Sequence, residues 1–302
     1  MRSALNLRMV LVLGVASVAV AASAFDRVFT FGDSLSDTGN TFNASFGLAG
    51  GPPYWNGRFS NGPVWVEGFS ADMDGAAVAH RLGGTNFAYG GAEANTGSAL
   101  STLLVPNVGT QIGLWQAAGN TFSATDLVVL WAGGNDFVTA NSTNPLGVAA
   151  NMATHMNTLY GLGARNFVLP NLPMLGYIPR YVGTANESVF NARTVTFNTA
   201  LAGHAADLRA RPGATVYEID VASLFNEVRL NPGAYGFSNV TQGFLDAGGN
   251  VNDFMFFDDI HPTAAVHEIL RQSATEAVPE PVSMVGLGVL AFVVARRRSR
   301  CA

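Results

Sequence analysis

Residues 127–131 read Leu-Val-Val-Leu-Trp, and this apolar run with two β-branched side chains decides the fold class. Such a run is typical of a strand that is buried on both faces of a sheet. Four more short runs are strand candidates, and they alternate with four helical patterns. The strand candidates are 27–31, 85–88, 166–169 and 215–219, and the helical patterns cover 63–82, 145–162, 188–209 and 263–277. This alternation predicts an α/β fold with a parallel sheet of about five strands, covered by helices on both faces.

The two ends of the chain differ in composition from the part between them. Residues 1–24 carry Arg2 and Arg8, then an apolar run, then Ala22-Ser23-Ala24, which is the order of a secretory signal peptide. Residues 278–302 begin Val-Pro-Glu-Pro, continue with an apolar run and end in an arginine cluster. This end resembles the PEP-CTERM sorting signal of bacterial surface proteins. A plain membrane anchor is the alternative.

The resemblance of the C-terminal end implies a route to the cell surface. A signal peptidase would remove residues 1–24, and an exosortase-like enzyme would cleave near the Pro-Glu-Pro while the last segment sits, at least transiently, in the membrane. We therefore predict a domain over 25–277 between a signal peptide at 1–24 and a sorting segment at 278–302, and a location that is secreted or at the bacterial cell surface.

The charge of the central domain excludes some classes of partner. Between residues 25 and 278 the chain carries ten Arg and no Lys against twenty Asp and Glu, a net charge of −10. An acidic body without a basic stripe is a poor match for nucleic acid or for an anionic membrane surface. The single cysteine, Cys301, lies in the C-terminal segment, so the domain has no disulfide and no thiolate metal site.

Ser34 directly follows the first predicted strand, in Phe-Gly-Asp-Ser-Leu-Ser-Asp over residues 31–37. Ligands of open parallel sheets bind at the carboxyl ends of the strands, so a serine here can reach a substrate. A nucleophile and a helix N-cap are equally consistent with this motif alone. Three Gly-, Pro- and Asn-rich segments are long for loops, which often indicates function; they are 37–62, 170–187 and 230–257.

His261 is the histidine best placed to activate a serine. The other four histidines, at positions 80, 155, 204 and 267, fall inside predicted helices, whereas His261 lies in the loop Phe-Asp-Asp-Ile-His-Pro-Thr over 257–263. Asp258, three residues earlier, can fold back to hold the imidazole Nδ1–H, which is the arrangement that a serine nucleophile requires. Asp259 is the competing carboxylate, and a capping residue in a loop is the alternative for His261.

Two glycine-containing blocks follow predicted strands. They are Asn-Phe-Ala-Tyr-Gly-Gly-Ala over 86–92 and Leu-Trp-Ala-Gly-Gly-Asn-Asp over 130–136. Each alone is consistent with a turn, but together they offer backbone N–H groups and an amide side chain at the sheet edge. Those are the donors that an oxyanion hole needs.

These blocks, taken in order, resemble the four sequence blocks of the GDSL (SGNH) hydrolase family, in its extracellular lipase and esterase branch. Residues 57–65 and 171–176 match that branch as well. The resemblance implies a three-layer α/β/α sandwich of flavodoxin-like topology and hydrolysis through an acyl-enzyme, without metal or cofactor. Ser34 would be the nucleophile, His261 the base and Asp258 its orienting carboxylate. The Ser34 and Gly90 N–H groups and the Asn135 side chain would bind the oxyanion, while Asp33 and Asp136 would brace the site.

The substrate class is left open by the sequence. A lipid ester and an acylated extracellular polysaccharide are both consistent with the resemblance, and the second would make the protein a carbohydrate deacetylase. Two non-enzymatic alternatives are a surface or matrix protein that keeps the fold, and a carbohydrate-binding module. The second would use the aromatic residues Tyr54, Trp55, Phe59 and Trp65 as a sugar platform.

Overall fold

The computed structural model describes residues 25–73, 75–97 and 105–278. Its centre is a parallel sheet in the order β1-β2-β3-β4. The strands are β1 (Arg27–Gly32), β2 (Asp126–Trp131), β3 (Asn166–Pro170) and β4 (Thr215–Ile219). Every residue of β2 is buried, as its apolar sequence predicts for a strand inside a two-faced sheet.

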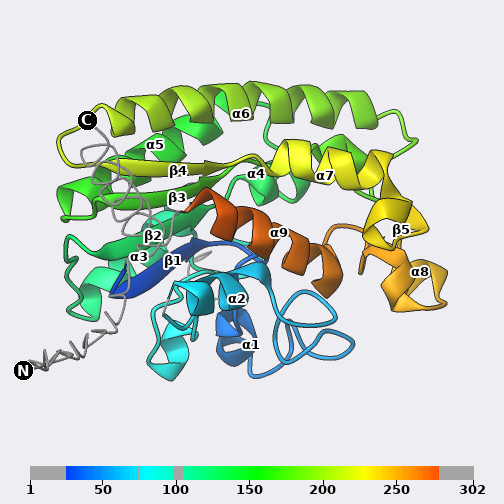
Figure 1. Cartoon of the computed structure of the whole chain (residues 1–302), viewed down its shortest axis with the longest axis horizontal. Helices are drawn as coiled ribbons and strands as arrows, with labels where there is room; N and C mark the ends of the chain where they lie inside the picture. The colour runs from blue at the N-terminus through cyan, green and yellow to red at the C-terminus, as the bar shows by residue number, and fades with distance from the viewer. Residues whose placement is uncertain (1–24, 74, 98–104, 279–302) are drawn as a thin grey trace, which may run out of the picture. The chain divides into compact units, whose positions relative to one another are not determined.

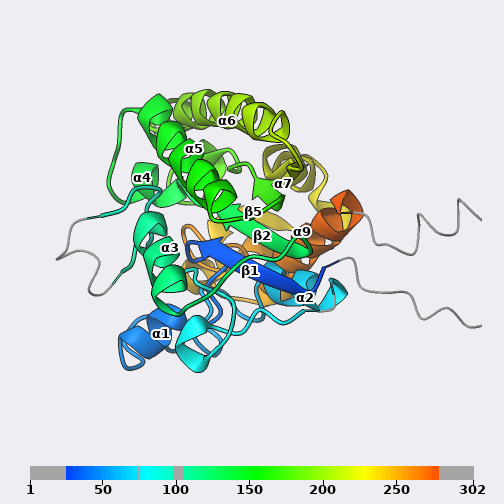
Figure 2. The same cartoon turned by 90° about the vertical axis from the view of Figure 1, so that its left-hand side faces the viewer.

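Helices cover both faces of this sheet and make the three layers (Figure 1, Figure 2). One layer holds α3 (Val108–Ala117), α5 (Pro145–Gly161) and α6 (Glu187–Arg209). On the other side lie α2 (Trp65–Asp72) and α9 (Ala264–Ala277), which pack against each other. The remaining helices are α1 (Asn40–Ala44), α4 (Gly134–Val138), α7 (Val221–Leu230) and α8 (Phe244–Ala247). The three-layer α/β/α fold predicted from the alternating pattern is thus confirmed.

The fifth predicted strand, 85–88, does not form as a strand. The segment lies beside β1 at the edge of the sheet, where the Phe87 N–H donates to the Thr30 carbonyl over 2.7 Å and the Tyr89 N–H to the Gly32 carbonyl over 3.1 Å, but the two chains share only the isolated bridge between Thr30 and Asn86. Between these two bonds the side-chain amide of Gln111 interrupts the ladder, since it accepts from the Gly32 N–H at 2.9 Å and also donates to the Gly32 carbonyl at 2.7 Å. Counting this segment as the second in the chain, the order becomes 2-1-3-4-5, the flavodoxin-like order.

The helix predicted over 63–82 forms only over the 8 residues of α2, less than half of the expected length. It ends at Asp72, where the Gly75 N–H closes a turn on the Ser70 carbonyl at 2.7 Å. Residues 78 and 79 are instead extended beside Asn86, whose N–H donates to the Val78 carbonyl at 2.9 Å, and a 3₁₀ turn follows over His80–Leu82. In this segment, hydrogen bonds to Asn86 at the edge of the sheet replace the helix that the sequence pattern predicts.

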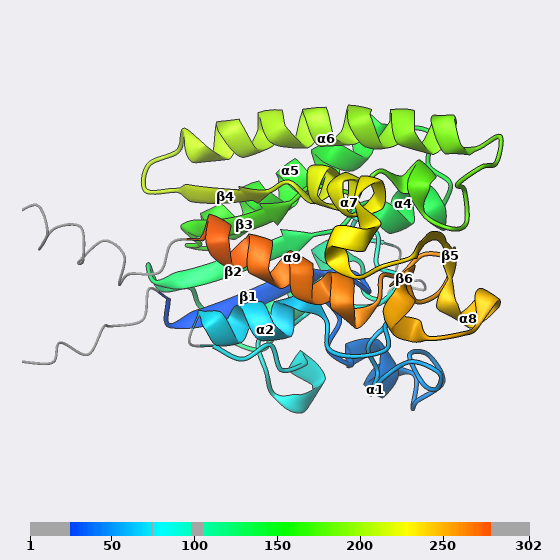
Figure 3. The ribbon, with the colours of Figure 1, turned by 45° about the vertical axis from the view of Figure 1, so that its right-hand side comes forward.

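The long segments predicted to be functional gather where the parallel strands end. Residues 230–257 contain a small parallel pair, β5 (Asn239–Gly243) and β6 (Phe254–Phe256), with α8 between them. Figure 3 shows this unit and α1 at the same end of the molecule. The site is therefore framed by loops from distant parts of the sequence.

The predicted signal peptide and all but the first residue of the predicted sorting segment lie outside the residues that the structure describes. Among the described residues, no helix is both long and apolar enough to cross a bilayer.

Candidate active site

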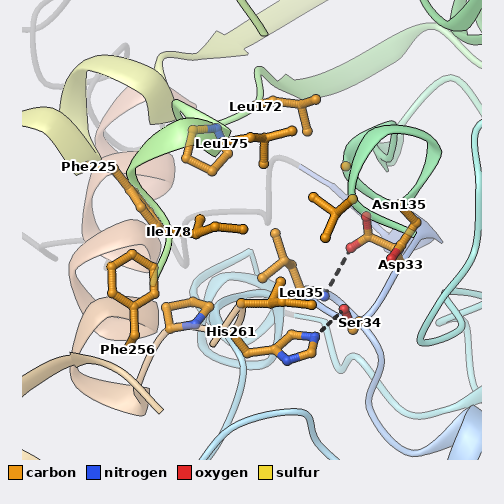
Figure 4. A pocket seen from close by; sticks show the side chains of 15 residues that line it. Asp33, Ser34, Leu35, Asn135, Leu172, Leu175, Ile178, Phe225, Phe256 and His261 are labelled. Carbon is orange, nitrogen blue, oxygen red and sulfur yellow. Dashed lines mark hydrogen bonds between the residues drawn. The ribbon is translucent and has the colours of Figure 1, made fainter. Parts of the chain in front are cut away.

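Ser34, His261 and Asp258 form one hydrogen-bonded series at the carboxyl end of the sheet. Ser34 lies two residues beyond the end of β1, and His261 lies in the turn that precedes α9. The Ser34 Oγ is 2.8 Å from His261 Nε2 (Figure 4). His261 Nδ1 is 2.7 Å from Asp258 Oδ2. Because a carboxylate only accepts hydrogen bonds, Nδ1 carries the imidazole proton and Nε2 is free to accept from the serine hydroxyl.

Asp258 is held as an anion by its surroundings. Its Oδ1 accepts the backbone N–H groups of Ile260 at 2.7 Å and His261 at 2.6 Å, which fixes the Asp-x-x-His turn. Its Oδ2 accepts the Tyr54 hydroxyl at 2.6 Å as well as the imidazole. Burial opposes ionisation, but the hydrogen bonds from His261 and Tyr54 outweigh it and hold the pKa of Asp258 below its usual range.

The competing carboxylate, Asp259, turns the other way. It forms an ion pair of 2.7 Å with Arg180 at the surface and contacts neither Ser34 nor the imidazole of His261. The structure therefore places only one of the two adjacent aspartates on the histidine.

Asn135 is positioned by the glycines that precede it. Gly133 has a φ of 116°, and the ring of Phe197 lies where its side chain would begin, so the chain leaves β2 sharply and starts α4 at Gly134. The Asn135 side chain then lines the pocket beside Ser34. Its Nδ2 donates one hydrogen to the Ala92 carbonyl at 3.1 Å, which leaves the second free.

Gly90 does not offer the free N–H that was expected of it. Its N–H already donates to Asp37 Oδ2 at 2.9 Å and to Thr41 Oγ1 at 2.7 Å, which hold it in the interior. The next residue, Gly91, is exposed with a φ of 84°, and its N–H meets no acceptor in the described part of the chain. The Ser34 N–H is likewise without an acceptor there.

Gly90 has a different part in the geometry of the site. A Cβ at this position would lie 2.1 Å from the ring of Phe59, and that ring packs against the imidazole of His261 with centroids 5.4 Å apart. The absence of a side chain at Gly90 therefore leaves room for the aromatic ring that supports the histidine.

Asp33 and Asp136 flank the site from inside the protein. Burial raises the pKa of Asp33 to about 6 and that of Asp136 to about 7. Each carboxyl accepts a backbone N–H, from Leu35 at 3.0 Å and from Ala94 at 2.8 Å respectively. Both acids fasten loop backbone around the site, which is the bracing arrangement expected from the sequence.

An apolar pocket of about 40 Å³ opens beside Ser34. Its only polar side chains belong to Asp33, Ser34, Asn135 and His261. The rest of its wall is apolar and includes Leu35, Leu172, Leu175, Ile178, Phe225 and Phe256 (Figure 4). The predicted functional loop at 170–187 supplies part of this wall, whereas Phe225 projects from α7 and carries no motif that singles it out in the sequence.

Two residues of the site escaped the sequence analysis in this role. Tyr54, on the long loop 37–62, binds Asp258 from 204 residues away. Gly243 lies against the Asp258 backbone, where a Cβ would come within 2.5 Å of the carbonyl. The sequence around Gly243 contains no motif that singles this glycine out, and the pairing of Tyr54 depends on the tertiary fold.

The aromatic residues considered for a sugar platform do not share a surface. Trp65 is buried in the core and Phe59 packs on His261, while Tyr54 is bound to Asp258. Only Trp55 is substantially exposed, at 39%. Over the described residues, no three His, Cys, Asp or Glu side chains are grouped as metal ligands would be.

Known proteins resemble this chain in sequence and in fold. Residues 28–272 match the family of GDSL-like lipases and acylhydrolases. The thermolabile hemolysin of Vibrio parahaemolyticus is 30% identical over 274 residues, covering 83% of this chain and 63% of that protein, so this chain spans less than two thirds of its length. The phosphatidylcholine-sterol acyltransferase of Aeromonas hydrophila is 30% identical over 240 residues, covering 76% and 70%. A solved structure of a G-D-S-L family lipolytic protein from Veillonella parvula matches with a TM-score of 0.49 and 13% identity, covering 83% and 96%.

Proposed function

This chain belongs to the family of GDSL-like lipases and acylhydrolases and is an ester hydrolase of the GDSL type, and from this premise we propose that it cleaves carboxylic esters with Ser34 as nucleophile, outside the cell that makes it. One observation carries the proposal: Asp258, His261 and Ser34 form a hydrogen-bonded series, and its Ser34 end lines an apolar pocket. A serine activated by an oriented base is suited to acyl transfer.

The reaction begins when Ser34 Oγ attacks the ester carbonyl carbon and its proton passes to His261 Nε2. The carbonyl electrons move to oxygen, and the tetrahedral oxyanion accepts hydrogen bonds from the N–H groups of Ser34 and Gly91 and from Asn135 Nδ2. When the C–O bond to the alcohol breaks, His261 returns the proton to the leaving oxygen. The acyl group is then an ester of Ser34.

Water completes the cycle by the same steps. His261 Nε2 removes a proton from water, whose oxygen attacks the acyl carbon, and the proton passes back to Ser34 Oγ as the acid leaves. Asp258 stays ionised throughout and stabilises the imidazolium that forms twice in each turnover. Gly91 replaces Gly90 in the proposed oxyanion hole, because the N–H of Gly90 is already bound to Asp37.

The wall of the pocket favours an apolar acyl group over an acetyl group on a sugar. Its side chains offer no hydrogen bonds beyond those of the reacting groups and Asp33, while each buried CH₂ gains about 0.8 kcal/mol on leaving water. Acylated polysaccharide is therefore the second candidate substrate.

Export is the other part of the proposal. It is supported by the signal-peptide order of residues 1–24 and by the Pro-Glu-Pro, apolar run and arginine cluster of residues 278–302. Removal by a signal peptidase and by an exosortase-like enzyme would leave a protein that starts at Phe25 and ends near Pro279. Mass spectrometry of the protein from its native cells tests both ends.

Hydrolysis of p-nitrophenyl acetate and butyrate by the full chain and by Ser34→Ala tests the chemistry. We expect kcat/KM to rise about tenfold from acetate to butyrate, and the variant to retain no more than about one thousandth of the wild-type rate. Ser36→Ala is the matched control, since Ser36 is buried two residues away and its hydroxyl accepts from the Trp65 indole at 3.2 Å rather than contacting His261. Equal rates in Ser34→Ala and wild type refute the serine mechanism.

Acetylated xylan provides the comparison for the second candidate substrate. Release of acetate from the polysaccharide at a higher kcat/KM than hydrolysis of p-nitrophenyl butyrate would make the protein a carbohydrate deacetylase instead.

A further inference from the structure

A long segment without charged residues follows the nucleophile loop and carries Tyr54, which contacts Asp258 and His261. No Asp, Glu, Arg or Lys occurs over residues 38–57, between Asp37 and Arg58. Within it, two large apolar side chains project almost completely into solvent: Phe46 is 96% exposed and Leu48 is 90% exposed. Side chains of this kind are usually kept at least partly covered, and two of them at one tip form an unusual apolar projection.

The projection is built into the loop. The chain turns back on itself around Phe42, whose carbonyl accepts the Gly47 N–H at 2.8 Å, while the Ala49 N–H donates to Ser45 Oγ at 2.9 Å. Gly57 packs so closely on Phe42 that an added Cβ would lie 2.8 Å from the Phe42 Cβ. The loop thus has fixed limbs, and Phe46 and Leu48 point outward from its tip.

The same loop is joined directly to the site. Tyr54, on its returning limb, donates its hydroxyl to Asp258 at 2.6 Å, and its ring meets the imidazole of His261 edge to face at 6.3 Å. In Figures 1 and 3 the loop after α1 lies at the same end of the molecule as β5 and α8. Whatever binds the tip is held at the end of the molecule where the site opens.

Charge restricts what can bind there. The described domain is acidic, and α8 and the turn before β6 add Asp246 and Asp253 to this end. Arg58 is already paired with Glu67 at 2.7 Å, whereas Arg81, on the 3₁₀ turn His80–Leu82 that contacts α1, is exposed. A single exposed arginine on a domain with a net charge of −10 attracts an anionic headgroup only weakly, so an electrically neutral surface fits best.

Area argues against a second protein or a second copy of this chain. A stable protein interface buries about 800 Å² on each partner, and two side chains on a convex tip provide a small part of that. Insertion of a few Phe, Leu and Trp side chains into the boundary of a bilayer needs no matching surface. We propose that the loop of residues 45–56 docks the protein on a zwitterionic phospholipid surface by inserting Phe46 and Leu48, so that esters at that surface reach Ser34.

Delivery of esters to Ser34 rests on the proposed hydrolase function, but insertion of the loop does not. A fluorescent label therefore tests insertion without turnover. Phe46→Cys and Val195→Cys, each in the Cys301→Ser full chain, are labelled with an environment-sensitive nitrobenzoxadiazole dye. Val195 is the matched control because it is an apolar residue, 52% exposed, on α6.

We expect the dye at position 46, and not the dye at 195, to shift its emission to the blue when phosphatidylcholine vesicles are added. Three results would overturn the proposal. One is an unshifted dye at 46, whether or not the protein sediments with the vesicles. Another is a shift that requires anionic phosphatidylglycerol. The third is a shift that grows with protein concentration in the absence of vesicles, which indicates self-association.

The unlabelled double variant Phe46→Asn/Leu48→Ser gives a kinetic test. Asparagine suits the positive φ of 54° at position 46. We expect unchanged hydrolysis of dissolved p-nitrophenyl butyrate and at least a fivefold loss on the same type of ester embedded in phosphatidylcholine vesicles. Equal loss on both substrates, or on neither, contradicts the docking role. Inactivity of the wild type on every ester would instead refute the hydrolase proposal and leave the dye experiment valid.

Discussion

Asp258 and Asp259 are adjacent in the chain, yet their carboxylates have different neighbours. Asp258 binds the imidazole of His261, two backbone N–H groups and the Tyr54 hydroxyl, and is only 8% exposed. Asp259 is paired with Arg180 at the surface. A surface ion pair contributes little to stability, whereas an orienting carboxylate in a triad determines the histidine tautomer.

We therefore expect opposite results from the same substitution at the two positions. Asp258→Asn should lower kcat on the order of ten-thousandfold, because an amide can present its NH₂ to Nδ1 and favour the wrong tautomer. Asp259→Asn should stay within about twofold of wild type. Steady-state hydrolysis of p-nitrophenyl butyrate measures both, and a greater loss at Asp259 would exchange the two roles.

The proposed role of Gly90 is steric, since it leaves room for the Phe59 ring, and its N–H is not proposed to bind the oxyanion. Gly90→Ala should lower kcat/KM about 10- to 100-fold by pushing Phe59 against His261, since small displacements of reacting groups have effects of this size. In a Phe59→Leu background, which removes the ring that the added methyl group would meet, Gly90→Ala should lower kcat/KM by a smaller factor than it does in the wild type. If the factor is the same in both backgrounds, the steric explanation is wrong.

At the scale of the elements, the free edge of β1 depends on one side chain. The amide of Gln111, projecting from α3, satisfies both backbone groups of Gly32 and also donates to the Pro106 carbonyl at 2.9 Å. It occupies the place of a continued fifth strand immediately before the nucleophile. Removing the amide leaves the buried Gly32 N–H and Pro106 carbonyl without hydrogen bonds, while the Gly32 carbonyl keeps the Tyr89 N–H at 3.1 Å.

Gln111→Met should lower the free energy of unfolding by about 1–3 kcal/mol, the usual effect of leaving buried polar groups unpaired. Gln116→Met, on the exposed side of the same helix, controls for the change in composition and should alter stability by less than about 0.5 kcal/mol. Urea denaturation of the full chain gives both values. Similar losses in the two variants would mean that Gln111 does not support the sheet edge.

Local pattern predicted most of these elements closely, and long-range contacts explain the rest. The strand at 127–131 and the helix at 188–209 are within one residue of their observed bounds, because their apolar content and length dominate. The segment 85–88 depends instead on side chains far away in sequence: Gln111 limits it, and Asn40 Nδ2 donates to the Asn86 and Ala88 carbonyls at 2.8 and 2.9 Å.

The candidate site shows the same division. Asp258 and His261 share one turn, so their pairing could be predicted from a spacing of three residues. The choice between Gly90 and Gly91 could not, since it depends on which N–H the buried carboxylate of Asp37 captures. Tyr54 meets Asp258 only through the tertiary fold, and no local pattern indicates that contact.

For the whole molecule, a second histidine links stability to pH. His267, on α9, is buried, and its Nδ1 accepts the Trp65 N–H at 3.3 Å, while its Nε2 has no partner among the described residues. Burial lowers its pKa to about 3, against about 6.5 in an unfolded chain. The unfolded state therefore takes up this proton first as the pH falls.

The contribution of His267 to the free energy of unfolding should be constant above about pH 6.5. As the pH falls from there to about 3, this contribution should destabilise the fold increasingly. Its slope is at most about 1.4 kcal/mol per pH unit. His267→Asn keeps an acceptor for the Trp65 N–H. The variant should lose the pH dependence that His267 adds to the free energy of unfolding between about pH 3 and 6.5. Denaturation of both proteins between pH 3 and 8 measures the difference, and parallel curves would exclude His267 as the cause.

The distance along the chain between nucleophile and base has a consequence for biosynthesis. Ser34 and His261 are 227 residues apart, so the base leaves the ribosome long after the nucleophile. A nascent chain can complete the strands of its sheet while it still lacks the group that activates the serine. Every incomplete product, whether from stalled translation or from a premature stop codon before position 261, consequently lacks the base of the proposed triad and would leave the esters of the cell that makes it intact.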